Sequence, residues 1–179
     1  MELLVTVTVI AALASLAIPA WGLLSKTVAR RNATAMVMES LERARSEAIT
    51  TKQDIWIIFC HHPRGDGPDA LRLVTKEGGP VSPRAIGPWI KLPPSISFRE
   101  GSGTLMDERP PDDIVKAAFT KPDQSGDFTA GALMFRRSGG IGIPAQGGNS
   151  LTISLGPSKG PDSIITLARA SGRASAESP

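Results

Sequence analysis

A long uncharged segment follows a single acidic residue at the start of the chain. After Glu2 no charged residue occurs until Lys26, and the stretch between them is rich in Leu, Ile, Val and Ala. About 20 apolar residues, each rising 1.5 Å in a helix, cross the roughly 30 Å hydrocarbon core of a bilayer. The stretch therefore predicts a membrane-spanning helix. A carboxylate at hydrocarbon depth is costly without a partner, so we expect Glu2 to have a function.

Two simpler explanations of this segment fit less well. A cleaved secretory signal has a basic residue before a shorter apolar stretch, and no Lys or Arg precedes this one. An ordinary single-span anchor fits the length but gives Glu2 no role. Pro19 removes one backbone hydrogen bond and is expected to kink the helix. The residues predicted to form the span are Leu3, Leu4, Val5, Val7, Val9, Ile10, Leu13, Leu16 and Ile18.

The helix is predicted to continue beyond the apolar segment into water. Ala33, Val37, Leu41, Ala44 and Ala48 are separated by three or four residues, which is the spacing of one helix face. The small side chains at the end of this series favour close packing onto a sheet. A single helix over about residues 2–51 would be roughly 75 Å long.

The rest of the chain predicts β-structure. Residues 55–60 are apolar on both faces of a strand, and residues 71–75 alternate as a hairpin partner should. One short element is expected near 113–119, inside a long proline-broken loop. Further strands are predicted over 88–92, 95–99, 131–136, 150–155 and 163–169.

These elements predict an α+β protein in four parts. Residues 1–25 form the membrane half of the N-terminal helix, and 26–52 form its amphipathic half. Residues 53–173 form one β-rich globular domain, and 174–179 are expected to be a flexible tail. The net charge of +3 gives no independent case for nucleic-acid binding.

Catalytic motifs are not evident. His61 and His62 are adjacent at a strand end, where successive side chains point to opposite faces. No cysteine or carboxylate cluster supplies further ligands at zinc-like spacing. Cys60 is the only cysteine, so it cannot form a disulfide within the chain, and we expect a small buried side chain on a strand. The sequence predicts neither an enzyme nor a cofactor.

Several segments resemble one family. Met1 to Thr6, the apolar run and Pro19 resemble the N-terminus of type IV pilin-like proteins. Later segments are similar to the FimT/GspH group of minor pilins and pseudopilins, and the resemblance covers nearly the whole chain. It implies a long pilin-like helix packed on an antiparallel β-sheet or sandwich domain. The later segments are residues 41–49, 89–93, 96–98, 133–135 with Gly139 and Gly140, and 164–167 with 171–173.

The resemblance implies a structural role. It suggests a minor pseudopilin or pilin that helps initiate or assemble a type II secretion pseudopilus or a type IV pilus. In such proteins the carboxylate matching Glu2 pairs with the N-terminal amine of a neighbouring subunit, and the proline matching Pro19 marks local helix melting. The implied partners are other pilin-like subunits, the inner-membrane assembly platform, membrane lipid and a prepilin peptidase.

The same resemblance places the chain in the inner membrane as a single-pass protein, with its globular domain in the periplasm. By themselves, Lys26, Arg30 and Arg31 after the span would favour the opposite orientation. Family members carry a short basic leader, then a Gly and a Phe at the peptidase cut, a few residues before the Glu. Because these are missing here, we expect Met1 to be an internal residue of a longer gene product.

Two other functions stay open. Some relatives bind DNA through a C-terminal Gly-Arg region with two arginines; here Ser175 stands at the second position. A DNA-binding minor pilin would use Lys and Arg contacts to phosphates. The other alternative is a plain membrane-anchored β domain with no filament role. The candidate DNA-binding residues are Arg136, Arg137, Arg169 and Arg173.

Overall fold

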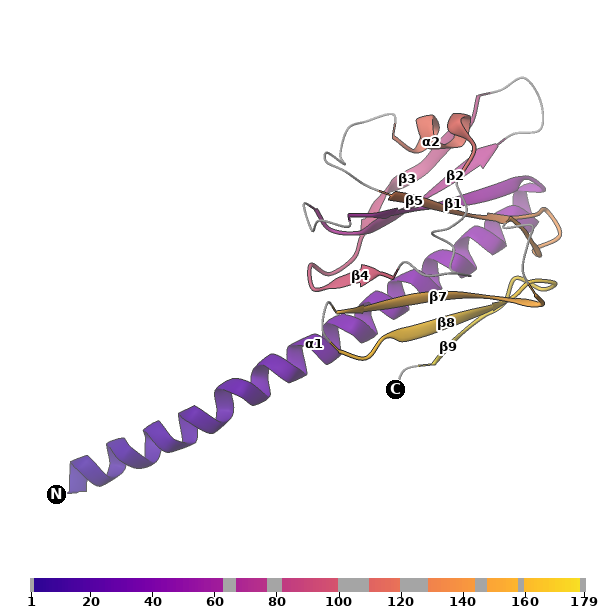
Figure 1. Ribbon diagram of the computed structural model, residues 1–179. Coiled ribbons are helices and arrows are strands. Elements are labelled where there is room, and N and C mark those ends of the chain that lie inside the picture. Colours follow the sequence, from indigo (N-terminus) through magenta and orange to yellow (C-terminus); the bar gives the residue numbers. More distant parts are fainter. Residues whose placement is uncertain are drawn as a thin grey trace.

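The computed structural model describes residues 2–62, 67–76, 82–99, 110–119, 129–143, 148–157 and 160–177. Within the first range, side chains are described for residues 5–8 and from residue 25 onward. A long helix, α1 (Glu2–Thr51), leads into a β-rich domain (Figure 1). The other elements are β1 (Asp54–His61), β2 (Ala70–Lys76), β3 (Arg84–Lys91), β4 (Ile96–Phe98), α2 (Asp112–Ala118), β5 (Thr129–Phe135), β6 (Ile141–Ile143), β7 (Ser150–Pro157), β8 (Ser163–Ala168) and β9 (Ala174–Glu177).

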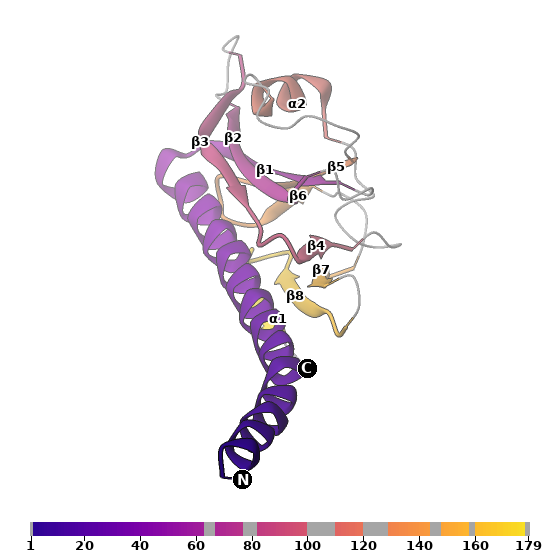
Figure 2. The same ribbon diagram turned by 90° about the vertical axis from the view of Figure 1, so that its left-hand side faces the viewer.

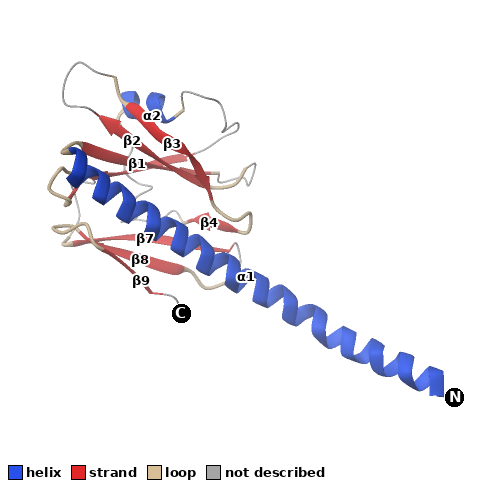
Figure 3. Cartoon of the chain, turned by 180° about the vertical axis from the view of Figure 1, so that it is seen from behind, coloured by secondary structure: helices blue, strands red, loops and turns tan. Residues whose placement is uncertain are grey.

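The described strands form two antiparallel sheets. The five-stranded sheet has the order β3-β2-β1-β5-β6, and the four-stranded sheet has the order β4-β7-β8-β9. Seen from behind, α1 crosses both sheets, and its N-terminal half projects away from them (Figure 3). The architecture is therefore α+β, with a helix that belongs only in part to the domain.

One face of α1 is buried against the domain, as its apolar spacing predicts. Ala33, Val37, Leu41, Ala44 and Ala48 join one apolar core with side chains from both sheets. Two arginines bind the same half of the helix to the domain by hydrogen bonds. The Arg30 Nη1 donates to the carbonyl of Pro161 at 3.1 Å, and the Arg45 Nε donates to that of Ser171 at 2.8 Å.

Strand β1 is buried on both faces, which confirms the prediction for residues 55–60. Ile55, Ile57 and Phe59 face the core shared with α1 and the second sheet. Trp56, Ile58 and Cys60 face a second core, which α2 covers. Figure 2 shows α2 on the side of the five-stranded sheet opposite α1. The sequence of a strand that is covered on both sides is a continuous run of apolar residues, without alternating polar ones. This pattern is why the segment could be identified from the sequence.

Polar contacts hold α2 on the sheet. The Arg72 Nη1 donates to the carbonyl of Ala118 at 2.6 Å, close to the C-terminal end of α2. The Lys76 Nζ lies 2.8 Å from the Asp113 Oδ2, and this hydrogen bond lowers the pKa of the Asp113 carboxyl. Both side chains of that pair are exposed, so its contribution to stability is small.

The expectation of a flexible tail from residue 174 is wrong for residues 174–177. They form β9, which pairs with β8 from Ile164 opposite Glu177 to Leu167 opposite Ala174. The segment Ala-Ser-Ala-Glu has little apolar side chain, so no hydrophobic pattern marks it. Backbone hydrogen bonding to β8 orders it instead. The three-residue strand β6 was also missed, since it is too short to show a period.

A buried carboxylate joins three segments at one end of the five-stranded sheet. Asp69, which lies just before β2, accepts hydrogen bonds from the backbone N–H of His62 at 2.9 Å and of Phe98 at 2.6 Å. Its Oδ2 also lies 2.8 Å from the His61 Nδ1. Phe98 belongs to β4 of the other sheet, so Asp69 connects the two sheets through their backbones.

Two glycine-containing turns meet beside the C-terminal end of α1. Gly139 and Gly172 have φ angles of +85° and +65°, which favour glycine. A Cβ on Gly172 would lie 2.1 Å from the carbonyl oxygen of Gly139, and one on Gly139 would lie 2.8 Å from the Ile49 Cδ1. The turn between β5 and β6 therefore packs against the turn between β8 and β9 with no room for a methyl group.

Replacing Gly172 with Ala should be strongly destabilising. The change adds the cost of a left-handed backbone, about 1–2 kcal/mol, and a clash with backbone atoms that adds about 1–3 kcal/mol. Gly87→Ala is the matched control, because Gly87 has φ +77° but nothing within 4 Å of a Cβ. Denaturant unfolding should show a loss about 2 kcal/mol larger at position 172. Equal losses at both positions would contradict the packing described here.

Replacing Asp69 with Asn should uncouple β4 from the first sheet. The Asn NH2 group would face at least one hydrogen-bond donor that the carboxylate accepts from, and an unsatisfied buried donor costs about 1–3 kcal/mol. We expect a loss of about 2–4 kcal/mol by urea unfolding. Asp54→Asn is the control, since among the described residues Asp54 accepts a single long hydrogen bond, of 3.3 Å, from the exposed backbone N–H of Arg137. A loss under about 0.5 kcal/mol for both variants would show that Asp69 is not a structural link.

Candidate functional site

A polar cleft lies at the seam between the two sheets. It has a volume of about 340 Å³ and is formed by the turn between β5 and β6, by β6 itself and by the turn that follows β8. The backbone N–H of Ile141 donates to the carbonyl of Arg169 at 2.8 Å, so the two walls are joined directly. The lining residues are Arg136, Ser138, Gly140, Ile141, Gly142, Arg169 and Ala170.

Glycines leave this cleft open. A Cβ on Gly142 would lie 2.2 Å from the Met134 Cε and 2.9 Å from the Arg136 Nε, so the missing side chain makes room for both of these side chains. A Cβ on Gly140 would lie 2.8 Å from the carbonyl oxygen of Ala170. The backbone N–H of Arg136 donates to the carbonyl of Gly140 at 2.8 Å, which closes the turn. The cleft is therefore framed by hydrogen-bonded backbone.

The charge in the cleft is of one sign. Arg136 comes from the first sheet and is exposed, and Arg169 comes from the second sheet and is half-buried. The lining residues include Ser138, whose hydroxyl can donate or accept, but no Asp or Glu is among them within the described part of the chain. The cleft is suited to an anion.

Two of the four arginines predicted to bind DNA meet in this cleft, and two do not. Arg136 and Arg169 line it together although they are far apart in the sequence. Arg137 and Arg173 are exposed and lie outside the lining. The backbone N–H of Arg137 instead contacts the Asp54 carboxylate at 3.3 Å. DNA binding by any of the four stays a prediction.

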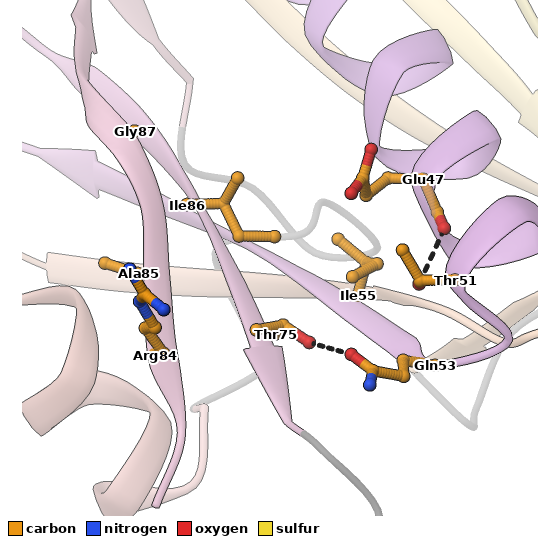
Figure 4. Close-up of a pocket in the computed structure, with 9 residues that line it drawn as sticks. All are labelled: Glu47, Thr51, Gln53, Ile55, Thr75, Arg84, Ala85, Ile86 and Gly87. Carbon is orange, nitrogen blue, oxygen red and sulfur yellow. Dashed lines mark hydrogen bonds between the residues drawn. The ribbon is translucent and has the colours of Figure 1, made fainter.

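A second hollow, of about 280 Å³, lies between the end of α1 and strands β2 and β3 (Figure 4). Glu47 of α1 and Arg84 of β3 come from opposite walls, so charges of both signs line it. The Thr75 hydroxyl and the Gln53 side-chain oxygen lie 2.8 Å apart and fill part of it. This hollow was not predicted, and its balanced charge favours no ionic ligand.

The residues predicted for membrane and filament contacts lie in the projecting half of α1. Glu2 and Pro19 are part of the helix, which runs on through residue 19, but their side chains lie outside the described ones. So do the predicted span residues other than Val5 and Val7, which are 62% and 55% exposed. In the part of the chain that the structure describes, no helix is long and apolar enough to cross a membrane. The span over residues 1–25 therefore stays a prediction.

The two histidines and the cysteine form no recognisable catalytic group. His61 and His62 both contact Asp69, His61 by its ring and His62 by its backbone, and the His62 side chain is buried. The role of Asp69 was missed because a single acidic residue after a segment rich in Pro and Gly has the pattern of an ordinary turn. No three His, Cys, Asp or Glu residues among the described ones are placed to hold a metal ion. Cys60 is a free, fully buried thiol, as predicted.

The chain is thus an α+β protein with two antiparallel sheets, a half-embedded N-terminal helix and an arginine-lined cleft. It is similar in structure to the type IV minor pilin FimU of Pseudomonas aeruginosa PAO1. One crystal structure of FimU has a TM-score of 0.47 at 16% identity and covers 83% of this chain and 92% of its own. A second has a TM-score of 0.46 at 18% identity, with 86% and 89% covered. No family model and no curated protein sequence matches the chain.

The Cys60 thiol should be inert in the folded protein. Burial raises its pKa from 9.0 to about 12, with a smaller contribution from the negative charge of Asp69. Because only the thiolate is nucleophilic, iodoacetamide at about pH 8 should label the urea-unfolded chain fully and the folded chain hardly at all, as intact mass would show. Labelling at similar rates in both states would contradict the burial.

The same pKa shift predicts a pH dependence. The folded state keeps the thiol protonated, so this group contributes stability below about pH 9 that is lost as the pH rises towards 12. The free energy of unfolding should therefore fall more steeply above pH 9 in the wild type than in Cys60→Ala. Parallel curves for the two proteins would contradict the shift.

Proposed function

We propose that this protein is a minor pilin or pseudopilin, a structural subunit that joins other pilin-like subunits through its N-terminal helix. The observation that carries the proposal is the division of α1. One half packs its apolar face into the domain, and the other half projects with Val5, Val7 and Val28 at least half exposed. The apolar sequence between Glu2 and Lys26 supports lipid or another protein as the surroundings of this half.

The length of the projecting half fits both environments. Residues 2–28 at 1.5 Å per residue extend about 40 Å, which matches a membrane with its interfaces or the interior of a filament. The resemblance of residues 1–6 to pilin-like N-termini supports the filament. The proposal places the subunit in the inner membrane before assembly, with its domain in the periplasm and with processing by a prepilin peptidase.

Glu2 is the residue that makes assembly selective in this proposal. A carboxylate in a low-dielectric environment is stabilised when it meets an N-terminal amine of a neighbouring subunit. The pair offsets a desolvation penalty that either charge alone would bear in full. Addition of the subunit to a filament is therefore favourable only when its position along the neighbouring subunit brings the two charges together. A type II secretion pseudopilus and a type IV pilus both satisfy this reasoning.

Replacing Glu2 with Ala in the chromosomal gene should block incorporation into filaments. An unpartnered buried amine costs about 3–5 kcal/mol, so the amount recovered in sheared filaments should fall at least tenfold. Glu39→Ala is the matched control, because Glu39 lies on the exposed face of the same helix. Immunoblots of membrane and filament fractions should show both variants in the membrane and only the control in filaments.

Two results would change the assignment. Normal incorporation of the Glu2 variant would remove the assembly role given to this residue. A wild-type protein found in membranes but never in filaments would favour a plain anchored β domain.

A DNA-binding minor pilin is the second candidate function. The arginine-lined cleft is the observation in its favour, because arginine side chains bind the phosphates of nucleic acids.

A further inference from the structure

We propose that the cleft between Arg136 and Arg169 is a binding site for a phosphoryl group. This inference does not rest on the proposed filament role, because the cleft is built entirely within the β-rich domain. Its walls come from two sheets that are joined there by the Ile141–Arg169 backbone hydrogen bond of 2.8 Å. The backbone segments that carry Arg136 and Arg169 are therefore held on opposite sides of the same cleft.

The chemistry of the lining selects an oxyanion. Arginine presents a planar fork of N–H donors that matches phosphate oxygens and carries its charge at all physiological pH values. Ser138 adds a hydroxyl, and the described residues that line the cleft include no Asp or Glu. Arg136 forms no ion pair with another described residue. Two positive charges in one concave site raise the local concentration of anions.

The size of the cleft indicates more than a bare ion. A volume of about 340 Å³ is at the lower end of small-molecule sites, which span roughly 300–1,000 Å³. The phosphoryl group can therefore belong to a small phosphate ester or to the backbone of a nucleic acid. The lining residues include no aromatic side chain on which a base could stack. Recognition would depend on the phosphate and not on a base.

The cleft is also preorganised. Gly140 and Gly142 place no side chain in it; a methyl group on Gly140 would meet the carbonyl oxygen of Ala170, and one on Gly142 would meet the side chains of Met134 and Arg136. The same turns are held by hydrogen bonds from Arg136 N–H to Gly140 and from Arg169 N–H to Asn149, at 2.8 and 2.9 Å. Binding therefore requires little ordering of backbone, which reduces its entropic cost.

The test is an amide chemical-shift titration of the full ¹⁵N-labelled chain, held in a non-ionic detergent. Inorganic phosphate and glycerol 3-phosphate are added first, and a short double-stranded DNA is added in a separate arm. We expect the largest saturable shifts at the amides of Gly140, Gly142 and Ala170. Arg136→Gln and Arg169→Gln should each weaken binding about tenfold. Arg137→Gln is the matched control and should change it less than twofold.

Each outcome is decisive. Saturation by glycerol 3-phosphate alone would identify a free phosphate ester as the ligand, and saturation by DNA at the same amides would identify a phosphodiester backbone. Absence of saturable shifts at these amides with any of the three ligands would overturn the proposal. So would equal weakening by the Arg137 and Arg136 variants, because that would indicate diffuse charge attraction. Unchanged amide chemical shifts of the glycines outside the cleft would show that each variant is folded.

Discussion

The packing of one face of α1 against both sheets is the contact on which the rest of the domain depends. Small side chains at Ala33, Ala44 and Ala48 let the helix backbone approach closely, and Val37 and Leu41 fill the space between them. Both sheets turn an apolar face to this core, so neither could lose the helix without exposing it to water. The cost of that exposure fixes the helix on the domain and leaves its N-terminal half free to serve another contact.

The seam between the sheets follows from the same arrangement. Once α1 holds the two sheets together, the β5–β6 and β8–β9 turns meet beside Arg45 and Ile49, and only glycine fits at positions 139 and 172. Arg45 also donates to the carbonyl of Ser171, which ties the helix to the second turn. The arginine-lined cleft lies next to this close meeting, and two other glycines, Gly140 and Gly142, are among the residues that line it.

The sequence predicted those elements whose side chains show a period or a continuous apolar run. The buried face of α1 and strand β1 are of this kind, and both were identified within a few residues. Strand β9 could not be, because its order comes from backbone pairing with β8 and not from apolar side chains. The cleft could not be predicted from the sequence either. Arg136 and Arg169 were named only as separate basic residues, and they come together only through the long-range packing of the two sheets.

The position of the cleft bears on how the two proposed activities could coexist. It adjoins the turn that contacts Arg45 and Ile49, near the C-terminal end of α1, whereas the projecting half of the helix ends near residue 28. About 17 residues of helix, or roughly 25 Å, separate these points. A subunit that assembled through the projecting half would bury that surface and still present the cleft at the far end of its domain. Filament assembly and phosphate binding therefore use surfaces that do not compete for the same residues.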